Sequence, residues 1–127
     1  MARILIIDDD ADVRMVTQDI LESAGHEVDC AANGLEGLGA QRRSPCDVAV
    51  VDLFMPEKEG VETIQDLKRE FPCLKIVAMS GGGRSIHSAR YLETASKLGA
   101  GAVLTKPFDA PTLLSAIDRL LHGPGSG

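Results

Sequence analysis

The sequence is poor in aromatic residues: no tryptophan, one tyrosine and three phenylalanines occur among its 127 residues. So few rings leave little to stack on an isoalloxazine, which disfavours a flavin-binding protein. No apolar run approaches the roughly 20 residues that a membrane span needs. Hydrophobic residues make up 44% and charged residues 25%, a balance typical of one globular domain at this length.

Cysteine and positive charge are also scarce. The cysteines, Cys30, Cys46 and Cys73, are three in number and far apart, so neither a disulfide framework nor a zinc site is indicated, and we expect buried or half-buried thiols. The net charge is −6, with 13 Lys and Arg residues against 19 Asp and Glu residues. This balance argues against direct nucleic-acid binding, because neutralising phosphates requires clustered basic residues.

Neither end of the sequence shows a targeting motif. The first residues run directly into an apolar pattern, with neither a signal nor a transit peptide, so we expect a cytoplasmic protein without membrane contact. We assign residues 1–122 to one domain. Residues 123–127, Gly-Pro-Gly-Ser-Gly, are expected to form a flexible tail.

Short apolar runs and helical periods alternate along the chain. The runs at residues 4–7, 48–51, 76–79 and 102–104 are unbroken, as expected for strands covered on both faces, and residues 27–31 form a weaker fifth candidate. Helical spacing of apolar residues follows at 13–24, 61–71, 86–98 and 113–121. The segment after Asn33-Gly34 is the poorest helix, because Gly37 and Gly39 lower its helix propensity. Asp109 is predicted to cap the last helix.

This alternation predicts a doubly wound α/β fold. Five strand–helix units with right-handed crossovers give an open parallel sheet with helices on both faces, a three-layer α/β/α sandwich. Sheets of this kind bind ligands beyond the carboxyl ends of their strands, where the strand order reverses. The residues at those ends are therefore the candidates for function.

Several chemically active groups lie at those ends. Asp8-Asp9-Asp10 follows the first strand, Asp52 ends the third, Ser80 the fourth and Lys106 the fifth. Clustered carboxylates need a cation or must stay partly protonated, and ligands made only of oxygen favour Mg²⁺. An aspartate can attack phosphorus, and a lysine, a hydroxyl and a metal beside it can stabilise the transferring phosphoryl group. Asp10 or Asp12 is expected to serve the start of the following helix instead.

These residues, in this order, resemble the receiver domain of two-component response regulators. The stretch Asp52-Leu53-Phe54-Met55-Pro56-Glu57-Lys58-Glu59-Gly60 is similar to the loop that follows the phosphorylation site in that family, and residues 98–108 are similar to its ending. The resemblance covers nearly the whole chain. It implies a flavodoxin-like (βα)5 fold with strand order 2-1-3-4-5.

The resemblance also implies a role for each site residue. Asp52 would accept the phosphoryl group, and Asp8 and Asp9 would bind Mg²⁺ together with Asp52 and the backbone carbonyl of Phe54. Ser80 and Lys106 would each contact a phosphoryl oxygen, and the Lys106–Pro107 bond would be cis.

The resemblance further implies the partners. The donor would be the phosphohistidine of a sensor histidine kinase or a phosphotransfer protein, or a small phosphodonor. The output would pass to a protein target through the fourth helix, fifth strand and fifth helix. The domain would catalyse only its own phosphorylation and dephosphorylation, so its role is regulatory rather than enzymatic.

Two features differ from the family pattern. Val103 stands where the family often has an aromatic residue that rotates on activation. The stretch from Ser80 to Lys106, which opens with Gly81-Gly82-Gly83-Arg84, is also somewhat longer than the usual spacing of the family. A valine cannot make that rotation, so we expect the glycine-rich loop to become ordered on phosphorylation instead.

Two other function classes remain open at this level. A phosphatase of the haloacid-dehalogenase type also uses an aspartate after the first strand, which would be Asp8 here. Its signature is Asp-x-Asp-x-Thr/Val, whereas this chain has Asp12 at the last of these positions, and its length leaves no room for a cap domain. An interaction module that works without phosphorylation could share the fold. The complete acidic site argues against the second alternative.

Overall fold

A computed structural model describes residues 2–53, 59–81 and 93–122. Within these ranges five strands form one parallel sheet: β1 (Arg3–Ile7), β2 (Glu27–Ala31), β3 (Val48–Asp52), β4 (Lys75–Gly81) and β5 (Ala102–Lys106). Their spatial order is β2-β1-β3-β4-β5, which confirms the expected topology. The weaker fifth candidate, residues 27–31, is confirmed as β2.

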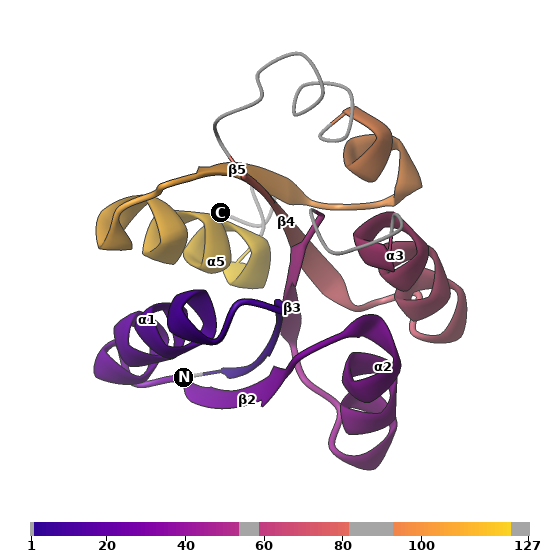
Figure 1. Cartoon of the computed structure of the whole chain (residues 1–127), viewed down its shortest axis with the longest axis horizontal. Coiled ribbons are helices and arrows are strands. Elements are labelled where there is room, and N and C mark those ends of the chain that lie inside the picture. The colour runs from indigo at the N-terminus through magenta and orange to yellow at the C-terminus, as the bar shows by residue number, and fades with distance from the viewer. Residues whose placement is uncertain (1, 54–58, 82–92, 123–127) are drawn as a thin grey trace.

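Helices cover both faces of this sheet. α1 (Ala11–Ser23) and α5 (Ala110–His122) lie on one face, and α2 (Gly34–Arg43), α3 (Glu59–Glu70) and the helical residues 93–98 lie on the other (Figure 1). The three-layer α/β/α sandwich is therefore confirmed. None of the helices in the described ranges has both the length and the hydrophobicity needed to cross a bilayer.

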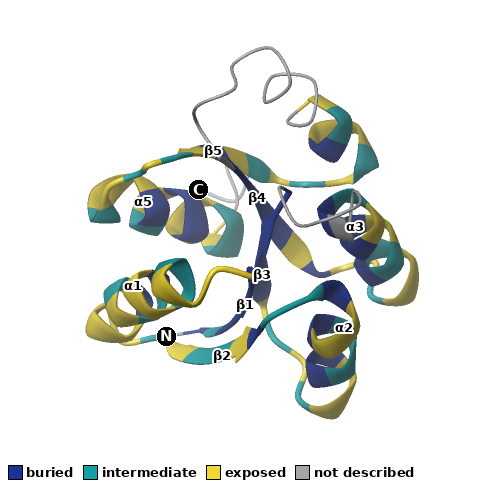
Figure 2. Ribbon diagram, in the orientation of Figure 1, coloured by how far each residue is buried: buried dark blue, intermediate teal, exposed yellow. Residues whose placement is uncertain are grey.

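The two faces of the sheet carry separate hydrophobic layers, because successive strand residues point to opposite sides. β3 is buried along its whole length, and β1 from Ile4 onward and β4 from Ile76 to Ser80 are also buried (Figure 2). One layer joins the strands to α1 and α5, and includes Ile4, Ile6, Val48, Val50, Leu21, Leu113 and Ile117. The other joins them to α2, α3 and the segment 93–98, and includes Leu5, Ile7, Ala49, Val51, Ile64, Leu67 and Ala95.

Polar caps fix where the helices begin. The Asp10 carboxylate accepts hydrogen bonds from the backbone N–H groups of Asp12 and Val13 at the start of α1, as the sequence predicts. The predicted cap of the last helix is also confirmed, since the Asp109 carboxylate accepts from the Thr112 N–H at 2.8 Å. These caps set α1 and α5 directly against the carboxyl ends of β1 and β5.

α2 forms despite its glycines, and one of them has a packing role. A Cβ atom at Gly37 would collide with the side chain of Ile7, whereas one at Gly39 would only meet the tip of Arg43 at 3.5 Å. Gly37 therefore lets α2 approach β1 closely. The low helix propensity of this segment is offset by packing against the sheet and by the Asn33 cap at its start.

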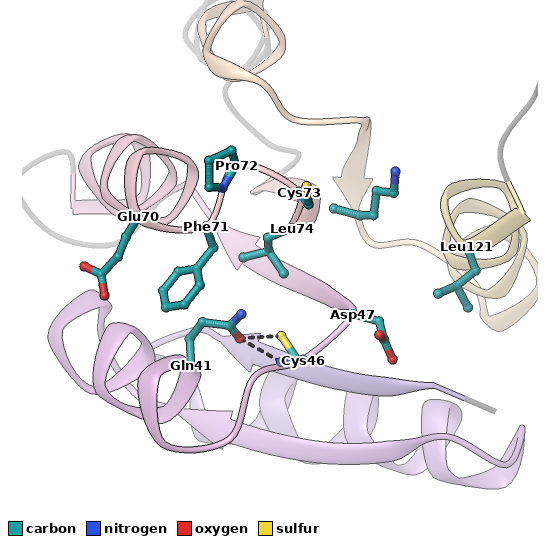
Figure 3. A pocket seen from close by; sticks show the side chains of 10 residues that line it. Gln41, Cys46, Asp47, Glu70, Phe71, Pro72, Cys73, Leu74 and Leu121 are labelled. Atoms are coloured by element: carbon teal, nitrogen blue, oxygen red, sulfur yellow. Dashed lines mark hydrogen bonds between the residues drawn. The ribbon is translucent and has the colours of Figure 1, made fainter.

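The expectation for the cysteines is confirmed only for Cys46. Cys30 and Cys73 are exposed, and all three thiols are free, so the prediction of burial is wrong for two of them. Cys46 lines a hollow of about 530 Å³ at the amino-terminal edge of the sheet, where its thiol donates a hydrogen bond to Gln41 (Figure 3). Burial raises the pKa of the Cys46 thiol to about 11, so it remains a neutral packing group.

The contrast between the two α2 glycines gives a test of the packing. Gly37→Ala should lower the free energy of unfolding by about 1–2 kcal/mol, because crowding Ile7 outweighs the gain in helix propensity. The matched change Gly39→Ala should raise it by roughly 0.5–1 kcal/mol, since that position has space. Urea unfolding of both variants measures the difference. Equal stability of the two would contradict the close approach of α2 to β1.

Candidate functional site

The predicted site residues meet at the carboxyl edge of the sheet. Asp8 and Asp9 directly follow β1, while Asp52, Ser80 and Lys106 lie at the ends of β3, β4 and β5. Because β1 lies between β2 and β3, this is also the point where the strand order reverses. The structure thus brings together residues almost 100 positions apart in the chain.

Three carboxylates form the acidic part of the site. Asp8, Asp9 and Asp52 each offer a carboxylate oxygen, and these oxygens lie within 4.8 Å of one another. Asp8 and Asp52 are buried, whereas Asp9 is exposed. The described members of this group are all oxygen ligands, with neither histidine nor cysteine, so the donor set fits Mg²⁺, and its exposed side leaves room for water or phosphate ligands.

Lys106 supplies positive charge to this cluster. Its Nζ donates a hydrogen bond to Asp8 Oδ2 at 2.8 Å and lies 3.4 Å from Asp52 Oδ2. Burial alone would lower the pKa of the Lys106 ammonium, but the hydrogen bond to Asp8 and the charge of Asp52 outweigh it and raise the pKa above its ordinary value. Lys106 is therefore a fixed cation at neutral pH.

Ser80 has a hydroxyl that is buried without a partner. The residue is 0% exposed, and in the described part of the chain its Oγ stands alone as a buried side-chain polar atom with no hydrogen bond. An unsatisfied buried hydroxyl costs about 1–3 kcal/mol, so such groups in native proteins call for an explanation. Ser80 lies on β4, and the residue before it, Met79, pairs with Asp52 on β3. A hydrogen-bond acceptor bound at Asp52 would therefore lie close to Ser80.

Hydrogen bonds fix both the carboxylate and the backbone N–H of Asp8. Its Oδ1 accepts from the backbone N–H of Asp10 at 2.9 Å, and its Oδ2 accepts from Lys106. Its own backbone N–H donates to the carbonyl of Ala31 at the end of β2. Both oxygens of this fully buried carboxylate are thus already engaged.

A glycine brings α3 against the end of β3. A Cβ atom at Gly60 would collide with the backbone carbonyl of Asp52 and lie 2.6 Å from the Cα of Leu53. Backbone atoms cannot move aside as a flexible side chain can, so only glycine fits at this position. The sequence shows Gly60 as part of a motif, but its packing role becomes visible only in the structure.

The remaining expectations concern two loops, the Lys106–Pro107 peptide bond and Val103. Phe54, whose carbonyl was expected to bind the metal, and the loop residues 82–84 lie outside the described residues. The Lys106–Pro107 peptide bond is cis, as expected. Val103, which has no ring, is 38% exposed on β5.

Comparisons with known proteins agree with the fold and the site. The sequence matches the family described as response regulator receiver domain over residues 4–118. It is 34% identical over 119 residues to the chemotaxis protein CheY of Thermotoga maritima, covering 93% of this chain and 96% of the relative. It is 32% identical to the DNA-binding transcriptional regulator NtrC of Azospirillum brasilense, covering 95% of this chain but only 24% of NtrC. The crystal structure of NtrX from Brucella abortus superposes with a TM-score of 0.88 at 28% identity, over 95% of this chain and 27% of that one.

The chain therefore belongs to the response regulator receiver domain family. It is a regulatory domain of two-component signal transduction, of the kind that accepts a phosphoryl group. It corresponds to nearly the whole of the chemotaxis relative and to a part of NtrC and of NtrX.

The charge imbalance of the site has a measurable consequence. Asp9→Asn removes one of three clustered carboxylates and leaves the Lys106 pairs in place, so without divalent cations it should raise the melting temperature by roughly 2–5 °C. Added Mg²⁺ should stabilise this variant less than the unmodified protein. Differential scanning calorimetry in EDTA and in Mg²⁺ measures both effects.

Asp19→Asn on the exposed side of α1 makes the same change in net charge and serves as the control. It should leave the stabilisation by Mg²⁺ intact. An unchanged response of Asp9→Asn to Mg²⁺ would remove Asp9 from the proposed ligand set.

Proposed function

We propose that Asp52 is the phosphoacceptor of a Mg²⁺-dependent phosphotransfer that switches the binding of a partner protein. The observation that supports this most directly is the buried, unpartnered hydroxyl of Ser80 on the strand beside Asp52, with Lys106 3.4 Å from the Asp52 carboxylate. A cation thus lies beside the Asp52 carboxylate, and the neighbouring strand carries a hydrogen-bond donor that has no other partner. That arrangement complements the oxygens of an arriving phosphoryl group.

The transfer follows from these positions. An Asp52 carboxylate oxygen attacks the phosphorus in line with the leaving group, the new O–P bond forms, and the N–P bond of a phosphohistidine donor breaks. Lys106 balances negative charge on one phosphoryl oxygen, and the Ser80 hydroxyl donates to another. Later attack by water on the phosphorus breaks the O–P bond to Asp52, releases inorganic phosphate and returns Asp52 to its carboxylate form.

Asp8, Asp9, Asp52 and the carbonyl of Phe54 would hold the metal ion. When bound, Mg²⁺ supplies positive charge next to the transferring phosphoryl oxygens. Asp8 acts here as a ligand rather than as the nucleophile: it is fully buried, so a phosphoryl donor could not approach it in line, but each of its oxygens accepts one hydrogen bond and keeps a lone pair for a small cation. This distinguishes the proposed chemistry from that of a phosphatase with its nucleophile after the first strand.

The donor in this proposal is a sensor histidine kinase or a phosphotransfer protein, or a small phosphodonor. We place the function in the cytoplasm on the basis of this donor class, and we assign residues 1–122 to the receiver domain, with 123–127 as a tail. Within that range the chain itself catalyses only the gain and loss of its own phosphoryl group.

The target would bind where residues 93–98, β5 and α5 meet. A groove of about 680 Å³ lies there, and its lining includes Ser96, Val103, Thr112 and Arg119. Val103 contributes an exposed aliphatic surface to it. The domain's net charge of −6 gives no support for nucleic-acid binding by this segment itself.

Replacing the nucleophile tests the assignment of Asp52. Incubation with acetyl phosphate and Mg²⁺ should add one phosphoryl group, which peptide mass spectrometry locates on Asp52. Asp52→Asn should reduce the adduct at this position to background, because an amide is a poor nucleophile. Adding EDTA should stop labelling of the unmodified protein.

Two outcomes would count against this proposal. Labelling of Asp8 at the same yield in the Asp52→Asn variant would favour the alternative nucleophile, and full labelling in EDTA would exclude a metal requirement. Ser80→Ala provides a graded comparison, since losing one hydrogen bond to a charged group should slow phosphorylation by about 10- to 100-fold without changing the position of the adduct.

A further inference from the structure

Arg14 makes a contact that neither the fold nor the phosphotransfer chemistry accounts for. It is the fourth residue of α1, and its side chain is partly buried. Its Nη1 donates a hydrogen bond to the backbone carbonyl oxygen of Asp8 at 2.7 Å. A charged donor makes this a strong hydrogen bond, and it is directed at the start of the acidic cluster.

The carbonyl that Arg14 holds belongs to the peptide unit between Asp8 and Asp9. A peptide unit is planar, so fixing its oxygen also fixes the direction of the Asp9 N–H and the position of the Asp9 Cα atom. On the other side of Asp8, the backbone N–H is bonded to Ala31, and the carboxylate is bonded to Asp10 and Lys106. Asp8 is therefore fixed by four separate contacts. The exposed Asp9 lies between two held peptide units: Arg14 holds the one before it, and the bond from the Asp10 N–H to the Asp8 carboxylate holds the one after it.

We propose that Arg14 is a positioning residue for the divalent cation: by holding the Asp8–Asp9 peptide plane, it places the Asp9 carboxylate within reach of Asp8 and Asp52. This inference rests on the proposed function, since it takes the three aspartates as the cation ligands. Arg14 itself does not touch the cation or the phosphoryl group. Groups that orient metal ligands in this way commonly contribute about 10- to 100-fold to metal affinity.

Charge and positioning make opposite predictions for the loss of Arg14. The guanidinium is a positive charge beside a cation site, so removing it should tighten cation binding if it acted through charge alone. Losing the hydrogen bond to the Asp8 carbonyl should instead weaken binding, because the Asp9 carboxylate is then less well placed. The sign of the change therefore separates the two effects.

The test is the affinity of the full chain for Mg²⁺, measured by isothermal titration calorimetry on the unmodified protein, Arg14→Met and Arg43→Met. Arg14→Met should weaken Mg²⁺ binding by about tenfold. Arg43→Met is the matched control, an exposed arginine at the end of α2 with the same loss of charge and length, and it should leave the affinity unchanged. Nuclear magnetic resonance of labelled protein should also show altered amide shifts at Asp9 and Asp10 in Arg14→Met before metal is added.

A kinetic measurement separates positioning from chemistry. In phosphorylation by acetyl phosphate, the Mg²⁺ concentration for half-maximal rate should rise about tenfold in Arg14→Met, in step with the weaker affinity. The rate at saturating Mg²⁺ should stay close to that of the unmodified protein. A fall in the saturating rate with unchanged Mg²⁺ dependence would assign Arg14 to the chemical step and overturn the inference.

Equal or tighter Mg²⁺ binding by folded Arg14→Met would also overturn it, since charge would then be the only effect. If Arg14→Met does not fold, Arg14→Gln is the deciding variant. Its shorter neutral side chain keeps the helix surface polar but does not reach the Asp8 carbonyl, so it should also weaken Mg²⁺ binding. An Mg²⁺ affinity equal to or tighter than that of the unmodified protein would refute the inference. A failure of the unmodified protein to bind Mg²⁺ would refute the proposed function itself, which is a distinguishable result.

Discussion

The ion pair between Lys106 and Asp8 is the contact on which both the fold and the site depend, because a buried carboxylate must have a partner. Asp8 is fully buried, and an unpaired charge at that position would destabilise the fold severely. Its partner lies 98 residues away at the end of β5. The ammonium reaches Asp8 because the parallel sheet brings the carboxyl ends of β1, β3, β4 and β5 to one edge. The same lysine is close to Asp52, so the contact that stabilises the fold also sets the charge of the site.

Much of this arrangement follows from local sequence patterns. Unbroken apolar runs such as residues 48–51 are typical of strands buried on both faces, and β3 is buried throughout. Once the runs are recognised as parallel strands, the residues that follow them must converge, which is why Asp9, Asp52 and Lys106 could be named together from the sequence. Helix caps at Asp10 and Asp109 were equally predictable, since they depend on contacts over two or three residues.

The features that could not be predicted depend on contacts and burial that the pattern of residue types along the sequence does not show. Arg14 on an amphipathic helix has the pattern of a solvated arginine, and only the turn of the chain after β1 brings the Asp8 carbonyl within its reach. Gly37 lowers helix propensity in sequence terms, yet it is required by the proximity of Ile7. The exposure of Cys30 and Cys73 was misjudged for the same reason: residue type indicates an average burial, while the actual value depends on which neighbours cover the position.

Because the Ser80 hydroxyl is buried without a partner, the free-energy cost of removing water from it arises when the chain folds. Water has already been removed from this group when the chain folds, so under the proposed function no further desolvation of the serine is needed when a phosphoryl group arrives. The site is thus preorganised: a small, permanent loss of folding stability takes the place of a barrier that would otherwise recur in every round of phosphorylation. Under the proposed function, such a receiver gives up some resistance to unfolding for a hydrogen-bond donor that is already free of water when the phosphoryl group arrives.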